Sequence, residues 1–180
     1  MVLTKTDLKK YFNADLQANG FKSYRNYLFK LFYGNERAYS VHYLRSLRRY
    51  EYYLNTNSIL KHLWRYINRR RSLKYGLVIG SNMVGPGLSI SHLQGGIIIN
   101  CFKMGANCSV AGGVVVGNKD SQDNRAYIGD CVHLTLGAKV IGKVTIGDNV
   151  VVAPNSVVVK DILPNSVVSG IPAKVIKVLD

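Results

Sequence analysis

The chain has 180 residues, a formal net charge of +14 and a hydrophobic content of 47%, so it can bury a sizeable core as one domain or as one domain with a small extension. No window approaches the ~18 consecutive apolar residues of a membrane span, and the charged N-terminus, with Lys5, Asp7, Lys9 and Lys10, lacks the apolar core of a signal peptide. These features predict a cytoplasmic protein.

Positive charge is concentrated in residues 1–75, which contain sixteen Lys or Arg, four acids and eleven of the twelve tyrosines. This segment carries +12, and residues 76–180 carry the remaining +2. One interpretation is a helical segment that caps an oligomer and whose charges are solvated. Another is peripheral contact with anionic lipid at the inner membrane face. Nucleic-acid binding is not expected, because no recognition motif accompanies the charge.

Capping residues and glycine stops predict four short helices in this basic segment. The expected ranges are Thr4 or Thr6 to about Asn19, Ser23 to Tyr33, and Glu36 to Leu54. A fourth helix is expected to start at Ser58 and to carry Leu60, Leu63, Trp64 and Ile67 before the run Arg69-Arg70-Arg71. In the third helix the apolar residues recur at helical spacing, whereas Arg45, Arg48 and Arg49 lie off that apolar stripe. If the charges are solvated, these arginines face solvent.

From Val78 onward a branched apolar residue or Met returns at nearly every sixth position. These lead residues are Val78, Val84, Ile90, Ile98, Met104, Val110, Val116, Ile128, Leu134, Val140, Ile146, Val152 and Val158. Small or apolar residues occupy the fourth position after most leads. Such hexapeptide repeats predict a parallel β-helix, in which three hexads form one triangular coil and the lead and the residue four later point inward. Thirteen leads predict a little over four coils.

Two breaks in the period mark candidate functional positions. Ile90 and Ile98 are eight residues apart, so two extra residues bulge out within the stretch 92–96. Val116 and Ile128 are twelve apart, and the wholly polar segment 118–125 between them predicts an extruded loop. Loops that leave a rigid scaffold are frequent places for binding and catalysis.

The repeats, the bulge at His92 and the ending Ser-Val-Val-Ser-Gly-Ile-Pro-Ala-Lys-Val at residues 166–175 together resemble the hexapeptide-repeat acyltransferases, in the serine acetyltransferase-like branch. The loop that opens Val-Val-Val-Gly-Asn-Lys is most similar to that of capsule, exopolysaccharide and O-antigen O-acetyltransferases. The resemblance covers residues 76–180. It implies an all-β left-handed parallel β-helix behind a small α-helical segment of residues 1–75, and a homotrimer with active sites between subunits. It also implies acetyl-CoA as co-substrate and no metal.

In that resemblance His92 stands at the catalytic histidine, a general base that takes the proton of an attacking hydroxyl. Backbone N–H groups at Gly95-Gly96 are candidates to stabilise the oxyanion. The expected substrate-binding residues are Ser91, Asp123 and Arg125. The expected cofactor-binding residues are Gly117, Leu136, Pro154, Lys160 and Lys174, with Lys139 and Lys177 as further candidates for the CoA phosphates. The alternative is that His92 is only a turn residue on a coil corner.

The sequence departs from serine acetyltransferases at the residues that recognise serine. Ser91 replaces the acid that precedes the histidine and holds the amine, and Leu77 replaces the acid that orients the histidine. Candidate orienting partners are a backbone carbonyl, Asn82, or Asp120 or Asp123 of a neighbouring subunit. We therefore expect acetyl transfer to a hydroxyl of a cell-surface glycan or its sugar precursor. The alternatives are serine O-acetylation for cysteine synthesis and an inactive trimeric scaffold.

The remaining histidines and the cysteines are expected to be structural. Three cysteines are too few and too irregularly spaced for a disulfide framework or a zinc site, so they predict reduced thiols in the core. His133 is expected on an outward strand position, and His42 and His62 lie in the helical segment.

Overall fold

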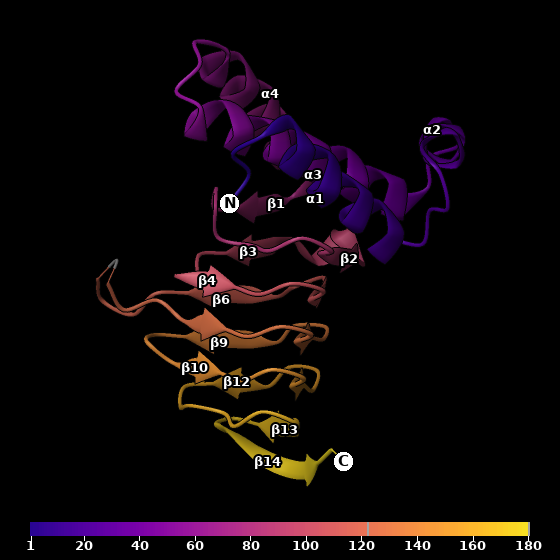
Figure 1. Cartoon of the computed structure of the whole chain (residues 1–180). Coiled ribbons are helices and arrows are strands. Elements are labelled where there is room, and N and C mark those ends of the chain that lie inside the picture. Colours follow the sequence, from indigo (N-terminus) through magenta and orange to yellow (C-terminus); the bar gives the residue numbers. More distant parts are fainter. Residues whose placement is uncertain (122, 180) are drawn as a thin grey trace.

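The computed structural model describes residues 1–121 and 123–179 and places a layer of helices on one end of a long β-helix (Figure 1). The helices are α1 (Lys5–Ala18), α2 (Tyr24–Phe32), α3 (Glu36–Asn55) and α4 (Leu60–Tyr75). The first strands are β1 (Leu77–Ile79), β2 (Ser89–Ser91), β3 (Ile97–Ile99), β4 (Lys103–Met104), β5 (Ser109–Ala111), β6 (Val115–Gly117) and β7 (Tyr127–Ile128). The later strands are β8 (His133–Leu134), β9 (Lys139–Ile141), β10 (Thr145–Ile146), β11 (Val151–Val152), β12 (Val157–Val158), β13 (Ser166–Gly170) and β14 (Ala173–Val178).

Local capping chemistry sets the helix ends close to where the sequence predicts them. The Thr4 hydroxyl accepts from the Asp7 N–H at 3.0 Å and the Asp7 carboxylate accepts from the Thr4 N–H at 2.9 Å, a capping box that starts α1. The Ser23 hydroxyl caps α2 by accepting from the Asn26 N–H at 3.2 Å. The four-helix prediction is confirmed. The last helix, α4, begins at Leu60, whose N–H donates to the Ser58 hydroxyl at 3.3 Å, and it continues past the arginine run to Tyr75. In the described residues, no helix is long and apolar enough to cross a membrane.

The strands form three parallel sheets around a triangular core. Sheet A has the order β1-β3-β6-β9-β12, sheet B the order β10-β7-β4, and sheet C the order β14-β13-β11-β8-β5-β2. Among the strands of the described residues, only β14 is antiparallel to its neighbour, and it closes the far end. The predicted parallel β-helix is confirmed, because strands that are consecutive in a sheet come from successive coils (Figure 1).

Inward columns of apolar side chains fill the β-helix, as the repeat predicts. In sheet A, Ile99 pairs with Val116, Val116 with Val140, and Val140 with Val158, and all four are at most 1% exposed. The residues four positions after the leads are buried as well; these are Cys108, Val114, Val132, Ala138, Val144, Val150, Ser156 and Ile162. Each coil buries its apolar face against the coils above and below it, so no coil is stable alone.

Two predicted leads were placed one residue off. Val78 and Ile98 are each 45% exposed, and their flanking residues in the strands 77–79 and 97–99 are buried instead. Both triplets consist only of branched apolar residues, so the sequence offers no contrast between inward and outward positions. The inward residue after Ile90 is therefore Ile99. The corner at His92 contains three residues more than a regular hexad, not two.

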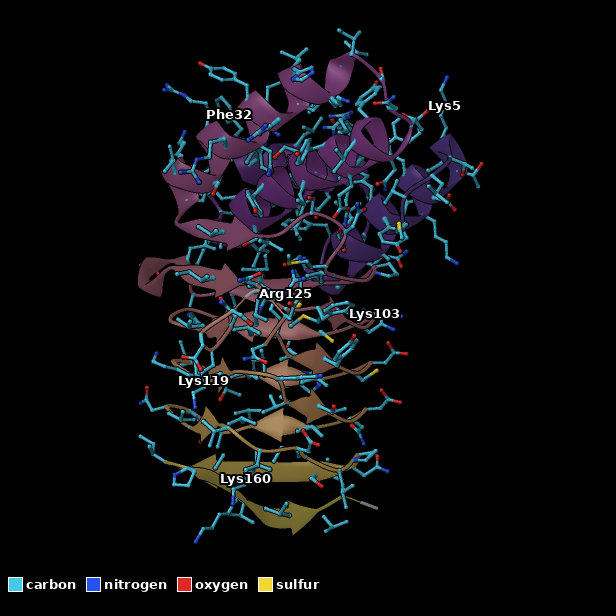
Figure 2. All side chains as sticks on the ribbon, turned by 90° about the vertical axis from the view of Figure 1, so that its left-hand side faces the viewer. Lys5, Phe32, Lys103, Lys119, Arg125 and Lys160 are labelled. Atoms are coloured by element: carbon cyan, nitrogen blue, oxygen red, sulfur yellow. The ribbon has the colours of Figure 1, made fainter. Side chains whose placement is uncertain are left out.

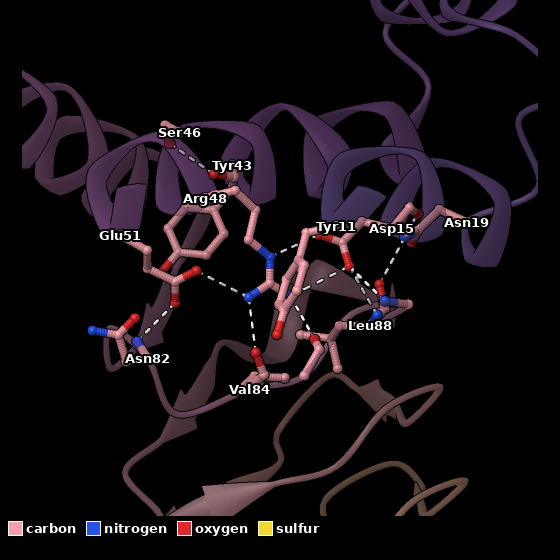
Figure 3. A network of polar contacts seen from close by, with 12 residues as sticks. Tyr11, Asp15, Asn19, Tyr43, Ser46, Arg48, Glu51, Asn82, Val84 and Leu88 are labelled. Carbon is pink, nitrogen blue, oxygen red and sulfur yellow. Dashed lines mark hydrogen bonds and ion pairs between the residues drawn. The ribbon is translucent and has the colours of Figure 1, made fainter. Parts of the chain in front are cut away.

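Arg48 is fully buried between α3 and the first coil, which corrects the expectation that it faces solvent (Figure 3). Its Nε lies 2.9 Å from Asp15 Oδ2 and its Nη1 lies 3.1 Å from Glu51 Oε2. Its remaining N–H groups donate to the carbonyls of Val84 at 2.8 Å and Gly85 at 2.6 Å. Two carboxylates and two carbonyls satisfy the guanidinium, which is the condition under which a buried charge is tolerated.

The cysteines divide between core and surface. Cys101 and Cys108 are buried, and burial raises the pKa of their thiols to about 12 and about 11. Cys131 is exposed at a corner of the β-helix, so the prediction that all three lie in the core was wrong for this one. The two core thiols are therefore inert at neutral pH.

His42 in α3 makes the stability of the helical segment depend on pH. Its Nδ1 lies 3.1 Å from the Tyr27 hydroxyl, and burial, together with the charges of Arg71, Arg45 and Lys74, lowers its pKa to about 4. A histidine in the unfolded chain has a pKa of about 6.5. Between about pH 4 and about pH 6.5, therefore, the unfolded chain binds the proton and the folded chain does not. Stability is therefore full above about pH 6.5 and is lost as pH falls toward 4.

We expect the free energy of unfolding to fall by about 1 kcal/mol between about pH 7.5 and pH 5, after allowance for solvent screening. Urea denaturation at a fixed protein concentration measures this change. His42→Gln removes the titrating group, so its stability should decline less over the same interval. Equal slopes for the two proteins would contradict the assignment.

Candidate active site

His92 lies at the corner where β2 of sheet C turns toward β3 of sheet A. Its backbone is left-handed, with φ 56° and ψ 65°, and it precedes the short 3₁₀ turn η1 (Leu93–Gly95). Most other left-handed residues besides glycine are asparagines, which adopt this conformation readily. The side chain of His92 is exposed. Its imidazole has no hydrogen-bond partner among the described residues, so it is free to meet a ligand.

The corner of the next coil lies directly beneath His92. A Cβ on Gly112 would stand 1.9 Å from the His92 carbonyl oxygen, so only glycine fits there. The Gly113 N–H donates to the Gly96 carbonyl at 2.7 Å, and the Gly96 N–H donates to the Leu93 carbonyl at 3.1 Å. The Gly96 N–H is therefore already engaged, which counts against the predicted oxyanion role for that group.

Successive corners continue this column down the edge between sheets C and A, here called the histidine edge. The Gly137 N–H donates to the Gly112 carbonyl, and the Asn155 N–H donates to the Leu136 carbonyl, each at 2.9 Å. Leu136 is 47% exposed on this edge, and Pro154 follows one coil below. The structure thus places two predicted cofactor-binding residues on the same edge as His92.

Further predicted residues also lie on or near the histidine edge. Ser91 ends β2 beside His92 with an intermediate exposure. The Lys139 ammonium is 3.5 Å from the Gly113 carbonyl and 3.4 Å from that of Gly137. Lys174 is in β14, where it pairs with Ser169 at the far end of sheet C.

The other predicted residues lie at the opposite edge of sheet A, here called the loop edge. Gly117 ends β6, and the described loop residues that follow it, 118–121 and 123–125, project from the β-helix (Figure 1). Figure 2, turned toward the side from which the loop projects, shows Lys119, Arg125 and Lys160 there. Asp123 is exposed in the loop. A single chain therefore does not bring these residues to His92.

Arg125 lies against the aromatic side chains at the loop edge. Its guanidinium is 5.2 Å from the centre of the Phe102 ring, and Phe102 stacks on Tyr127 with ring centroids 4.7 Å apart. Among the described residues, the buried Nε of Arg125 has no hydrogen-bond partner. Cation–π contact holds the guanidinium in place while leaving donors available for an anionic group.

The outward face of sheet A separates the two edges and is apolar in its first three strands, before Lys139 continues the same row. Val78, Ile98 and Val115 are in register on this face. They line a hollow of about 270 Å³ together with Leu73 of α4 and the Gly95-Gly96 turn. Exposed branched side chains on a flat face are a feature of surfaces that bind another protein chain.

The structure excludes two residues as direct partners of His92 within one chain. Asn82 lies at the loop edge of the first coil, and its side chain exchanges two hydrogen bonds with Asn55, at 2.9 and 2.8 Å. Leu77 is a fully buried core residue. His133 points outward from sheet C, as predicted, and its Nδ1 is 2.6 Å from the Ser109 hydroxyl. Among the described residues, no cluster of His, Cys, Asp or Glu could hold a metal ion.

Sequence analysis missed three residues of the N-terminal helical segment that hold the chain on either side of His92. The Asn19 side chain accepts from the Ile90 N–H at 3.0 Å and donates to the Leu88 carbonyl at 2.9 Å. The Ser40 hydroxyl donates to the Ile90 carbonyl at 3.2 Å, and the Glu36 carboxylate accepts from the Leu93 N–H. Asn19 and Glu36 lie at helix ends, where Asn and Glu are common because they cap the helix. Their residue types therefore gave no signal of a contact with a distant strand.

These features define a parallel β-helix of hexapeptide repeats with an exposed histidine at one corner. No protein-family profile matches the chain. It is 35% identical over 96 residues to the serine acetyltransferase of Staphylococcus xylosus, which covers 52% of this chain and 44% of that protein. It is 33% identical over 99 residues to serine acetyltransferase 2 of Arabidopsis thaliana, and this alignment covers 54% of this chain and 31% of that protein. The chain thus spans less than half the length of these curated relatives.

Solved structures extend the similarity to the helices. The serine acetyltransferase of Neisseria gonorrhoeae in complex with serine superposes with a TM-score of 0.76 at 28% identity, covering 94% of this chain and 69% of that chain. A serine acetyltransferase in complex with CoA superposes with a TM-score of 0.73 at 20% identity, covering 96% of this chain and 70% of that chain. The fold is therefore the left-handed β-helix with N-terminal helices that these enzymes have.

Proposed function

We propose that the chain is an acetyl-CoA-dependent O-acetyltransferase with His92 as general base. The observation that carries this proposal is the free imidazole at the head of the histidine edge, in a fold shared with a CoA-bound serine acetyltransferase. The imidazole takes the proton of an acceptor hydroxyl, whose oxygen attacks the thioester carbonyl of acetyl-CoA. The carbon–sulfur bond breaks, and the leaving sulfur receives a proton to give free CoA.

Acetyl-CoA is proposed to lie along the histidine edge. Leu136 and Pro154 offer apolar contact at successive corners below His92. Lys139 places an ammonium near the carbonyls of Gly113 and Gly137. Lys174 stands at the far end of sheet C, and Lys160 stands on the loop edge. These cations suit the CoA phosphates, whose charges lie far from the thioester.

A threefold assembly would unite the two edges. The histidine edge and the loop edge flank the apolar outward face of sheet A, on which Val78 and Ile98 are exposed. A cyclic, head-to-tail contact through this face would bury those side chains and bring the loop of one chain to His92 of the next. We propose a homotrimer whose active sites lie between subunits, with Gly117, Asp123 and Arg125 contributed by the neighbour.

L-Serine is the first candidate acceptor, because the similar proteins are serine acetyltransferases and one was solved with serine bound. A free amino acid needs an anionic partner for its ammonium and a cationic partner for its carboxylate. Asp123 and Arg125 of a neighbouring subunit would supply these charges across the proposed interface. The hydroxyl of serine would then face His92.

A hydroxyl of a cell-surface glycan or its sugar precursor is the second candidate. Ser91, not an acid, stands beside His92, and Leu77 is buried in the core, so neither residue supplies a carboxylate for an ammonium group. The Glu36 carboxylate near this corner already accepts from the Leu93 N–H. A neutral sugar needs none. The exposed aromatic pair Phe102 and Tyr127 at the loop edge would suit a sugar ring. If the acceptor is such a glycan, the basic helices would also be expected to contact anionic lipid.

Release of free thiol from acetyl-CoA, with a panel of acceptors, tests the proposal. We expect saturable turnover with L-serine, and Arg125→Met should raise the KM for serine about tenfold or more because a charge-assisted contact is lost. Turnover only with amino sugars or oligosaccharides, unaffected by Arg125→Met, would assign the second candidate. If thiol release is no faster than spontaneous hydrolysis of acetyl-CoA with every acceptor tested, the proposed activity is wrong. The inactive trimeric scaffold would then be the remaining interpretation.

A further inference from the structure

The helices complete the hydrogen bonding of the open end of the β-helix. Strand β2 is the last strand of sheet C, so one row of its backbone groups has no neighbouring strand. Asp15 Oδ1 accepts from the N–H groups of Gly87 at 2.9 Å and Leu88 at 3.0 Å, and Asn19 bridges Leu88 and Ile90 (Figure 3). Side chains of α1 and its C-cap thus take the place of a missing strand.

This row of side-chain contacts continues from the strand into the corner that carries His92. Ser40, one turn into α3, donates to the Ile90 carbonyl. Glu36, in the first turn of α3, accepts from the Leu93 N–H. Residues on both sides of His92 are therefore fixed to the same helix.

The conformation of His92 explains why such anchoring matters. A residue other than glycine costs about 1 kcal/mol when its backbone is in the left-handed region. The turn at His92 therefore needs support from its surroundings. The corner beneath leaves room only for glycine at Gly112, and the helix above holds the turn through the bond from the Leu93 N–H to Glu36. Because the Leu93 N–H belongs to the peptide that follows His92, loss of the Glu36 contact would free the ψ angle that aims the imidazole.

We propose that Glu36 is a positioning residue for His92, and that it stands in for the orienting acid that Leu77 does not supply. The proposal rests on the function proposed for His92. Glu36 does not touch the reacting atoms in this scheme. It fixes the backbone of the corner through the Leu93 N–H, and the corner then fixes the direction of the imidazole.

Two variants of Glu36 separate hydrogen bonding from charge. Glu36→Ala removes the acceptor, whereas Glu36→Gln keeps a side-chain oxygen that can accept from the Leu93 N–H. We expect Glu36→Ala to lower kcat about ten- to a hundredfold with little change in the KM for acetyl-CoA, because a displaced base affects the chemical step. Glu36→Gln should stay within about threefold of the original chain. Arg37→Ala, an exposed change in the same helical turn, is the matched control.

Amide hydrogen exchange gives a readout that does not depend on turnover. The Leu93 amide should exchange about tenfold faster or more in Glu36→Ala than in Glu36→Gln and Arg37→Ala, while amides of β9 and β11 keep their protection. Equal exchange of Leu93 in all three variants would overturn the proposal, as would equal loss of kcat in Glu36→Ala and Glu36→Gln. If the original chain turns over no acceptor, the proposed function fails, yet the exchange experiment still decides whether Glu36 holds the corner.

Discussion

Replacement of His92 by asparagine should lower kcat with the true acceptor at least about a hundredfold, because a carboxamide cannot take the hydroxyl proton. His92→Asn is the sharper variant, since asparagine tolerates the left-handed backbone that the corner requires. His92→Ala adds backbone strain to the chemical change. Thiol release from acetyl-CoA measures the effect, with circular dichroism and the thermal midpoint to show that the β-helix is intact.

His133→Asn is the matched control for this experiment. His133 is exposed on the outward face of sheet C and is paired with Ser109, away from the corner that presents His92. Its replacement should leave turnover within about twofold. If His92→Asn retains turnover within a few-fold of the original chain, His92 is only a turn residue and the proposed mechanism is wrong. A loss of similar size in both variants would show that the assay does not report on His92.

The β-helix could be predicted from the sequence because its structural constraint is repeated in every coil. Each hexad must place an apolar residue inward, so a single misplaced position does not hide the period. The prediction went wrong only where the pattern lost contrast, at Val78 and Ile98, because every residue of those strands is branched and apolar. Assignment of the inward side then depends on register with the next coil, which is a property of the folded chain.

The position of His92 at an irregular corner of the β-helix could be predicted as well, because the bulge interrupts a strict period. Its supports could not, since Asn19, Glu36 and Ser40 contact residues 71, 57 and 50 positions away in the sequence. Nothing in the local sequence distinguishes a carboxylate that caps a helix from one that also reaches a distant peptide. The division of the predicted site between two edges of sheet A was equally hidden, because sequence spacing does not reveal which corner of a coil a residue occupies.

Arg48→Met should lower the free energy of unfolding by about 3–5 kcal/mol, because it strands the carboxylates of Asp15 and Glu51 in a buried site. The carbonyls of Val84 and Gly85 lose their donors as well. The urea midpoint at a fixed protein concentration measures this change, because association would otherwise shift it. Arg49→Met is the control, since Arg49 lies 4.8 Å from the Trp64 ring in a partly exposed position and should contribute no more than about 1 kcal/mol.

The triple variant Asp15→Asn, Arg48→Met and Glu51→Gln separates stranded charge from lost packing. It leaves no ion unpaired, and Asp15→Asn keeps an oxygen that can accept from the N–H groups of Gly87 and Leu88. We expect it to recover at least half of the stability lost in Arg48→Met. If Arg48→Met is no more destabilising than Arg49→Met, the ion cluster does not fasten the helices to the β-helix. If the triple variant is instead the least stable, the charges contribute net stability and the cluster fastens the two layers through ion pairing, not through shape.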